Sequence, residues 1–217
     1  MNNEWISISD MMSGLMLIFL FIAISFMVKV ESEKQEMKDV VIEYRDTKVN
    51  LNEALYSEFG SDLQEWNAEI TKDNSIVFSS PNVLFDISKS DVKDEFKKVL
   101  DSFFIRYMKI LTSPKYKSEI EELRVEGHTS NKWKNSSSEK EIYLKNMQLS
   151  QSRAYSVLAY CYNIENELVK KNRTWLEKYF RANGMAFSKL KEQSKARRVE
   201  FTIRLKSEDK VYKILEK

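Results

Sequence analysis

Residues 9–28 read SDMMSGLMLIFLFIAISFMV, a run in which no residue after Asp10 is charged. At ~1.5 Å of helix rise per residue, about 20 apolar residues cover the ~30 Å hydrocarbon core of a bilayer. A secretory signal peptide would carry a basic region before this run and a small-residue cleavage site after it. The sequence has neither, since no Lys or Arg precedes Asp10 and Val28-Lys29-Val30-Glu31 follows. We therefore predict a retained single span over residues 6–30, with Trp5 at the interface.

Asp10 stands at the start of this run, and its position allows two interpretations. In the headgroup region it would be an ordinary interfacial carboxylate. Drawn into the apolar zone, it would cost on the order of 2.5–3.5 kcal/mol to insert, and such residues face a partner or a water path where they are protonated reversibly. Ser9, Ser13 and Gly14 lie within about one helical turn and permit close helix approach. The pattern favours a helix packed against other helices.

Composition excludes several classes of protein. The 35 Lys and Arg residues against 33 Asp and Glu residues leave a net charge of +2, a mixed surface rather than a nucleic-acid footprint. Four Gly and two Pro in 217 residues favour a helix-rich chain with short loops. The single Cys161 is predicted to be a buried thiol, with an intermolecular disulfide as the alternative. Because only the C-terminal flank of the span carries Lys, loop charge alone would place the following domain inside the cell.

Between the span and a globular region, residues 31–74 are predicted to form a helical connector. Apolar residues recur at spacings of three, four or seven from Met37 to Ile70, with a break predicted at Gly60. The stripe fits an amphipathic helix lying on its own domain, or a short dimer contact that continues the membrane helix. Both alternatives stay open.

Residues 75–206 are predicted to form an α/β sandwich, with helices on one face of a small mixed sheet. Alternating or β-branched residues indicate strands, which we place at 75–79, 120–127 and 198–205. Wider apolar spacings indicate helices, which we place from Ser90 or Asp91 to Leu111, over 141–164 and over 173–182. Pro81-Asn82 is predicted to be a turn, 132–140 a polar loop and 207–217 a C-terminal tail.

Four segments of this region resemble the signature segments of the OmpA-like peptidoglycan-binding domain. They are Val83-Leu84-Phe85-Asp86, Val125-Glu126-Gly127-His128-Thr129, the helical segment 146–157 and Arg197-Arg198-Val199-Glu200-Phe201. A single Asp-bearing span followed by such a domain resembles the MotB family of stator subunits. The SDMMSGLM context and the run from His128 to Trp133 resemble more closely the MotB-like subunit of the Zorya anti-phage defence system.

The resemblance implies a homodimer whose membrane helices pass through a pentamer of MotA-like partner subunits in the bacterial inner membrane. The N-terminus, residues 1–5, would be cytoplasmic and the C-terminal domain periplasmic, bound to peptidoglycan, which overrules the loop-charge argument. Asp10 would carry the transported ion, H⁺ or Na⁺, with H⁺ favoured because one carboxylate suffices. The implied function is a rotary, ion-driven motor in defence. The alternatives are a flagellar MotB subunit and a passive wall tether without ion transport.

The resemblance also implies the residues that bind the wall. Arg153 takes the place of the family's Arg, whose fork of donors grips a stem-peptide carboxylate. Asn146 and Leu149 match family positions two turns and one turn before it, and Thr129 follows Gly127-His128. Ser130 replaces the family's Asp, which removes a charge pairing with an ammonium group. A retained fold with weakened wall binding is therefore an alternative.

Other chemistry is not expected. His128 has no second His to join it, so a His-based metal site is not predicted, and it is interpreted as a structural residue at a strand end. The pair Arg197-Arg198 is interpreted as flanking the last strand rather than binding nucleic acid. The sequence has no Gly-rich phosphate loop and no Ser/His/Asp arrangement, so we predict neither an enzyme nor a bound cofactor.

Overall fold

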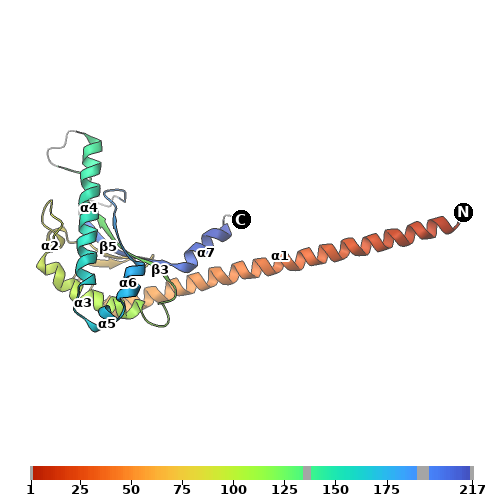
Figure 1. The fold of residues 1–217 in the computed structure, drawn as a ribbon, viewed down its shortest axis with the longest axis horizontal. Helices are drawn as coiled ribbons and strands as arrows, with labels where there is room; N and C mark the ends of the chain where they lie inside the picture. The colour runs from red at the N-terminus through yellow and green to blue at the C-terminus, as the bar shows by residue number, and fades with distance from the viewer. Residues whose placement is uncertain (1, 134–137, 190–195, 216–217) are drawn as a thin grey trace.

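One long helix leads into the globular part of the molecule (Figure 1). The computed structural model describes residues 2–133, 138–189 and 196–215. Helix α1 (Asn2–Phe59) runs without interruption for 58 residues, a length of ~90 Å. Within the described chain it is the one helix long and apolar enough to span a membrane. Its side chains from Met11 to Val28 are exposed, an apolar surface of the kind that contacts lipid or other proteins.

The C-terminal end of α1 is part of the domain core. Leu51, Leu55 and Phe59 are fully buried, because a spacing of four residues places them on one helical face. The helix ends at Phe59, which confirms the predicted break at Gly60. The helical pattern predicted beyond it is wrong, since strand β1 (Ala68–Ile70) follows. The Tyr56 hydroxyl donates to the carbonyl oxygen of Ile70 and holds β1 beside α1.

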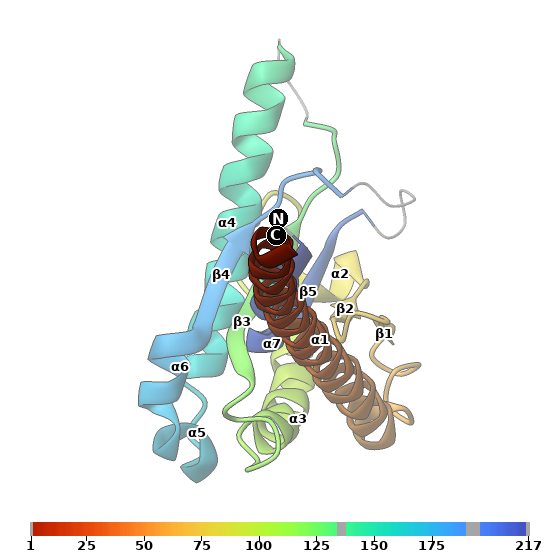
Figure 2. The same cartoon turned by 90° about the vertical axis from the view of Figure 1, so that its right-hand side faces the viewer.

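A five-stranded mixed sheet forms the centre of the domain, in the order β1-β2-β5-β3-β4 (Figure 2). Its other strands are β2 (Ile76–Phe78), β3 (Ile120–His128), β4 (Phe180–Gly184) and β5 (Arg198–Leu205). Only β3 and β4 pair in parallel; the other neighbours are antiparallel. The three predicted strands and the mixed sheet are confirmed. The two edge strands were not predicted, and β4 replaces the end of the helix predicted over 173–182.

Two long helices cover one face of this sheet. Helix α3 (Asp94–Leu111) places Phe103 edge-on against Phe78 of β2 and Phe201 of β5, with ring centroids 5.2 and 5.0 Å away. Helix α4 (Glu139–Tyr162) lies against β3 and β4. Phe201 pairs with Val125 in the register of β5 and β3, so both side chains lie on the covered face. Cys161 is a buried free thiol, as predicted.

The remaining helices are short. They are α2 (Pro81–Leu84), α5 (Glu167–Lys171), α6 (Arg173–Tyr179) and α7 (Lys206–Leu215). The turn predicted at Pro81-Asn82 is the start of α2. The helix predicted to begin at Ser90 or Asp91 begins at Asp94, after the N-cap Lys93, which makes no side-chain capping bond.

Helix α7 occupies most of the predicted tail. It lies beside α1 (Figures 1 and 2). The Tyr44 hydroxyl donates to Glu208 Oε1 over 3.1 Å. Met1, residues 134–137 of the predicted polar loop, residues 190–195 and residues 216–217 of the predicted tail lie outside the described residues.

Candidate functional site

A pocket of about 250 Å³ opens where β3 ends beside α4. Its lining contains all five residues that the sequence predicts to bind the wall. Three come from α4 and two are the residues that directly follow β3: Asn146, Leu149, Arg153, Thr129 and Ser130. The spacing of three and four residues along α4 places its three side chains on one face. The structure thus brings the predicted set together at the point where β3 ends beside α4.

Arg153 is held rigidly at the base of this pocket. Its side chain is buried; Nε donates to the carbonyl oxygen of Lys89 over 2.9 Å, and Nη2 donates to that of Asp86 over 3.2 Å. The guanidinium carbon lies 4.8 Å from the centre of the Phe85 ring. Burial, and then the charge of Arg197, lowers the pKa of Arg153 to about 10. In the described chain no carboxylate pairs with Arg153, so it stays an uncompensated cation.

The neighbouring polar groups also face the pocket. Thr129 is only 3% exposed, and its hydroxyl has no hydrogen-bond partner in the described part of the chain, which is costly for a buried polar group. Asn146 is buried and donates its amide nitrogen to the carbonyl oxygen of Ile142 over 2.9 Å. Ser130 and Leu149 are half-buried. Fixed donors beside a partly apolar wall suit a ligand with a carboxylate.

The structure adds residues that sequence reasoning missed. Arg197, Lys132, Trp133, Ile87 and Ser88 complete the lining. The adjacent pair Arg197-Arg198 is a signal in the sequence, and we interpret the pair as flanking the last strand. The structure shows that Arg197 also lines the pocket. Alternation along the chain separates the two side chains: Arg197 reaches the pocket, and Arg198 enters a buried network behind it.

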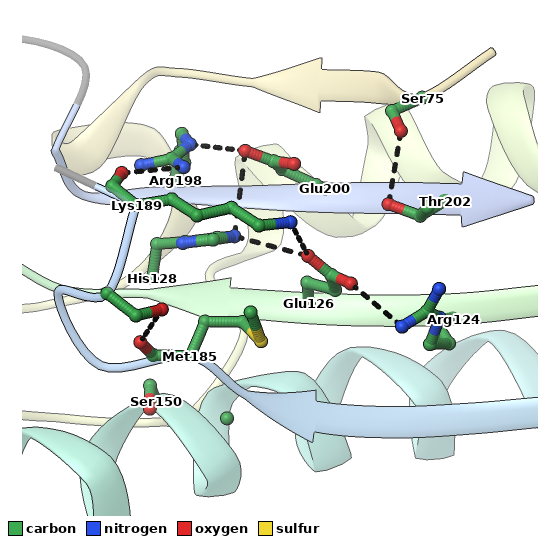
Figure 3. A network of polar contacts seen from close by, with 12 residues as sticks. Ser75, Arg124, Glu126, His128, Ser150, Met185, Lys189, Arg198, Glu200 and Thr202 are labelled. Atoms are coloured by element: carbon green, nitrogen blue, oxygen red, sulfur yellow. Dashed lines mark hydrogen bonds and ion pairs between the residues drawn. The ribbon is translucent and has the colours of Figure 1, made fainter. Parts of the chain in front are cut away.

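That network lies on the face of the sheet opposite α3 and α4 (Figure 3). Glu126 Oε2 is 3.3 Å from Lys189 Nζ and 3.7 Å from His128 Nε2. Glu200 Oε1 is 2.5 Å from Arg198 Nε and 3.5 Å from His128 Nε2. His128 is buried at the end of β3, where the sequence places it.

Ion pairs satisfy the network's carboxylates. Candidate ligand atoms of Glu126, His128 and Glu200 lie within 4.8 Å of one another, which is close enough to hold a metal ion. However, Lys189 and Arg198 already contact the same carboxylate oxygens. A dication would meet two like charges there, so we interpret the cluster as structural charge pairing.

The network predicts a pH dependence of stability. Burial alone would raise the pKa of Glu126, but the His128 ring and the charges of Lys189 and Arg124 outweigh it and lower the pKa below its usual 4.5. Because the folded-state pKa is below the unfolded one, the stabilisation is present above about pH 4.5 and is lost as pH falls through the folded-state value.

We expect thermal unfolding of the full chain to show that stability falls as the pH is lowered from about 5 to about 3, the range in which such carboxylates titrate. Glu126→Gln should show a shallower fall over the same interval, because the variant has no proton to gain at this position. The exposed Glu167→Gln provides the matched control and should keep the wild-type slope. Equal slopes for Glu126→Gln and the wild type would contradict this role of the network.

Asp10, the other predicted functional residue, lies in the part of α1 that projects from the domain. Its side chain is exposed, and the structure does not bring it near the pocket. One turn on, the Ser13 hydroxyl donates to the carbonyl oxygen of Ser9 over 2.9 Å. A Cβ added at Gly14 would meet nothing within 4 Å, so this end of α1 has an open surface in the single chain.

Comparison with known proteins gives one relative by sequence and several similar folds. No family model matches the chain. Zorya protein ZorB of Escherichia coli (strain ATCC 8739, Crooks) is 37% identical over 223 residues, which cover 99% of this chain and 93% of the relative.

Three solved structures illustrate the similar folds. A putative MotB-like protein from Desulfovibrio vulgaris has 15% identity and a TM-score of 0.47, over 78% of this chain and 99% of that one. The cell wall anchor of the T6SS from Pseudomonas aeruginosa has 20% identity and a TM-score of 0.46, over 70% and 97%. The periplasmic domain of Helicobacter pylori MotB has 17% identity and a TM-score of 0.43, over 69% and 96%.

Proposed function

Because this chain belongs to the family of Zorya protein ZorB, we propose that it is the single-pass inner-membrane subunit of a stator-like motor that acts in anti-phage defence. The observation that carries the proposal is the extent of the 37% identity, which covers 99% of the chain and thus both the apolar helix and the domain. It favours a Zorya subunit over a flagellar MotB. The chain is not an enzyme; its role is to join a membrane machine to a fixed support.

The membrane part of the proposal rests on Asp10 and its surroundings. Two copies of α1 would pass through a pentamer of MotA-like, ZorA-type subunits, with the N-terminus in the cytoplasm. Asp10 would take up an ion, H⁺ rather than Na⁺, from one side and release it to the other while the helix pair and the partner ring rotate relative to each other. Each charge that crosses supplies ~2.3 kcal/mol per 100 mV. The apolar side chains around α1, exposed in the single chain, are suited to contact partner helices or lipid.

The periplasmic part of the proposal rests on the pocket and on the distance that α1 provides. Between Val30 and Tyr44, which bonds to α7, α1 continues as a mostly exposed stalk of ~20 Å, which would hold the domain away from the membrane surface. The pocket would then bind a stem peptide of peptidoglycan, with Arg153 gripping its carboxylate. Wall binding would provide the fixed point against which the motor exerts torque.

Sedimentation with isolated peptidoglycan tests this anchor. The full chain in detergent micelles should sediment with wall sacculi, and Arg153→Ala should remain mostly in the supernatant because it lacks the buried cation. Arg181→Ala is the matched control: Arg181 is exposed on β4 and, within the described residues, donates only to carbonyl oxygens of 177, 178 and 180, so this variant should sediment normally.

An equal melting temperature for Arg153→Ala and the wild type would establish that the variant is folded. Sedimentation of folded Arg153→Ala at the wild-type level would refute the proposed wall-binding role of the pocket.

A further inference from the structure

Resting on the proposed wall binding, we infer that the pocket recognises the carboxylate of a stem peptide without recognising a neighbouring amine. Peptides whose side-chain amine is acylated, as in cross-links, would bind at least as tightly as peptides with a free amine.

The described lining of the pocket is positively charged. Lys132, Arg153 and Arg197 all line the pocket, and no Asp or Glu is among the described lining residues. Arg153 and Arg197 are close enough for the charge of one to lower the pKa of the other. An anion placed between them would relieve this repulsion, whereas an ammonium group would add to it.

Hydrogen-bond donors for a carboxylate are already in place on the pocket lining. Two nitrogens of Arg153 are bonded to carbonyl oxygens, while its Nη1 has no hydrogen-bond partner in the described chain. The buried Thr129 hydroxyl on the same lining is also unpartnered there. A ligand carboxylate that accepts from both groups would satisfy the Thr129 hydroxyl and would need no rearrangement of Arg153.

The described acidic side chains near the pocket already pair with Lys or Arg side chains. The Asp86 carboxylate lies 3.5 Å from Lys89 Nζ and 3.7 Å from Lys93 Nζ. Glu126 and Glu200 belong to the buried network of Figure 3, on the other face of the sheet. Among the described lining residues, an amine in the pocket would therefore find only neutral acceptors, such as the Ser130 and Ser88 hydroxyls.

Part of the pocket rim is apolar. Ile87 is 79% exposed beside the pocket, and Trp133 and Leu149 line it as well. An acyl group on the amine removes its charge and adds apolar surface that these side chains can cover. Acylation should therefore favour binding.

Binding of soluble stem peptides to the full chain in detergent micelles tests the inference. The probes are one peptide with a free side-chain amine, the same peptide with that amine acetylated, and a third form with the carboxylate amidated. We expect the acetylated form to bind at least as tightly as the free-amine form, and the amidated form to bind more than tenfold more weakly. A tenfold preference of the wild type for the free amine would overturn the inference and leave wall binding intact.

A substitution at Ser130 provides the second readout. Ser130→Asp supplies an anionic partner for the amine and should shift the preference about tenfold toward the free-amine form, whereas the uncharged Ser130→Asn should leave the ratio unchanged. An unchanged ratio in Ser130→Asp would count against the inference. If neither the free-amine nor the acetylated form binds and wall sacculi also fail to sediment the wild type, the proposed wall binding fails together with the inference.

Discussion

Replacing Asp10 with Asn should leave the protein folded and assembled but abolish protection against phage. Asn has nearly the same shape as Asp, but it cannot be protonated and deprotonated. If Asp10 carries the ion, the gradient can no longer do work through the variant. We expect the efficiency of phage plating to rise to that of cells without the system, while the variant still reaches the membrane and co-purifies with its MotA-like partner.

Two comparisons make this result specific. Asp10→Glu keeps the carboxylate and should retain part of the protection. Asp39→Asn makes the same change in the exposed part of α1 beyond the apolar run and should protect normally. Full protection by Asp10→Asn would refute the proposal that Asp10 carries the ion and would favour the alternative of a passive wall tether. On that reading, the combined substitution of Asn146, Leu149 and Arg153 would abolish function and Asp10→Asn would have no effect.

Gly127→Ala should severely destabilise the domain, because β3 and α4 approach each other at this residue with no room for a side chain. A Cβ at this position would lie 2.2 Å from the carbonyl oxygen of Ser150 and 3.3 Å from the backbone nitrogen of Ala154. Both are backbone atoms of α4, so no side chain can rotate away. We expect a loss of ~3 kcal/mol or more, the upper end of the cost of overpacking. Thermal unfolding of the full chain should show a melting temperature lower by about 6–12 °C.

Gly14→Ala is the matched control for this clash. The same methyl group is added there, in the exposed part of α1, and meets nothing within 4 Å. The melting temperature of the domain should therefore match that of the wild type. If Gly127→Ala melts with the wild type as well, then β3 and α4 separate more easily than the structure implies, and the pocket between them is less rigid than we infer.

Much of the fold could be predicted because its signals are local. The apolar run, the strict alternation of β5 and the broad apolar face of α3 each specify an element within one stretch of chain. Strand β1 has three residues, and its hydrogen bonds depend on β2 and Tyr56, so no local pattern marks it. Strand β4 is specified by pairing with β3 and by Gly184, where a Cβ would lie 2.6 Å from the backbone nitrogen of Gln151.

By itself the sequence determined the apolar span with its carboxylate at Asp10 and the α/β class of the domain, since periodicity and residue chemistry are properties of the chain alone. Five of the residues that line the pocket followed from the resemblance to the OmpA-like domain. The tertiary structure decided the charge of that pocket. Adjacent residues Arg197 and Arg198 point to different places, and Glu126 and Glu200 are neutralised by cations on the opposite face of the sheet. Which acid pairs with which cation depends on the register of β3 with β5 and on the position of Lys189, and these are contacts between distant parts of the chain.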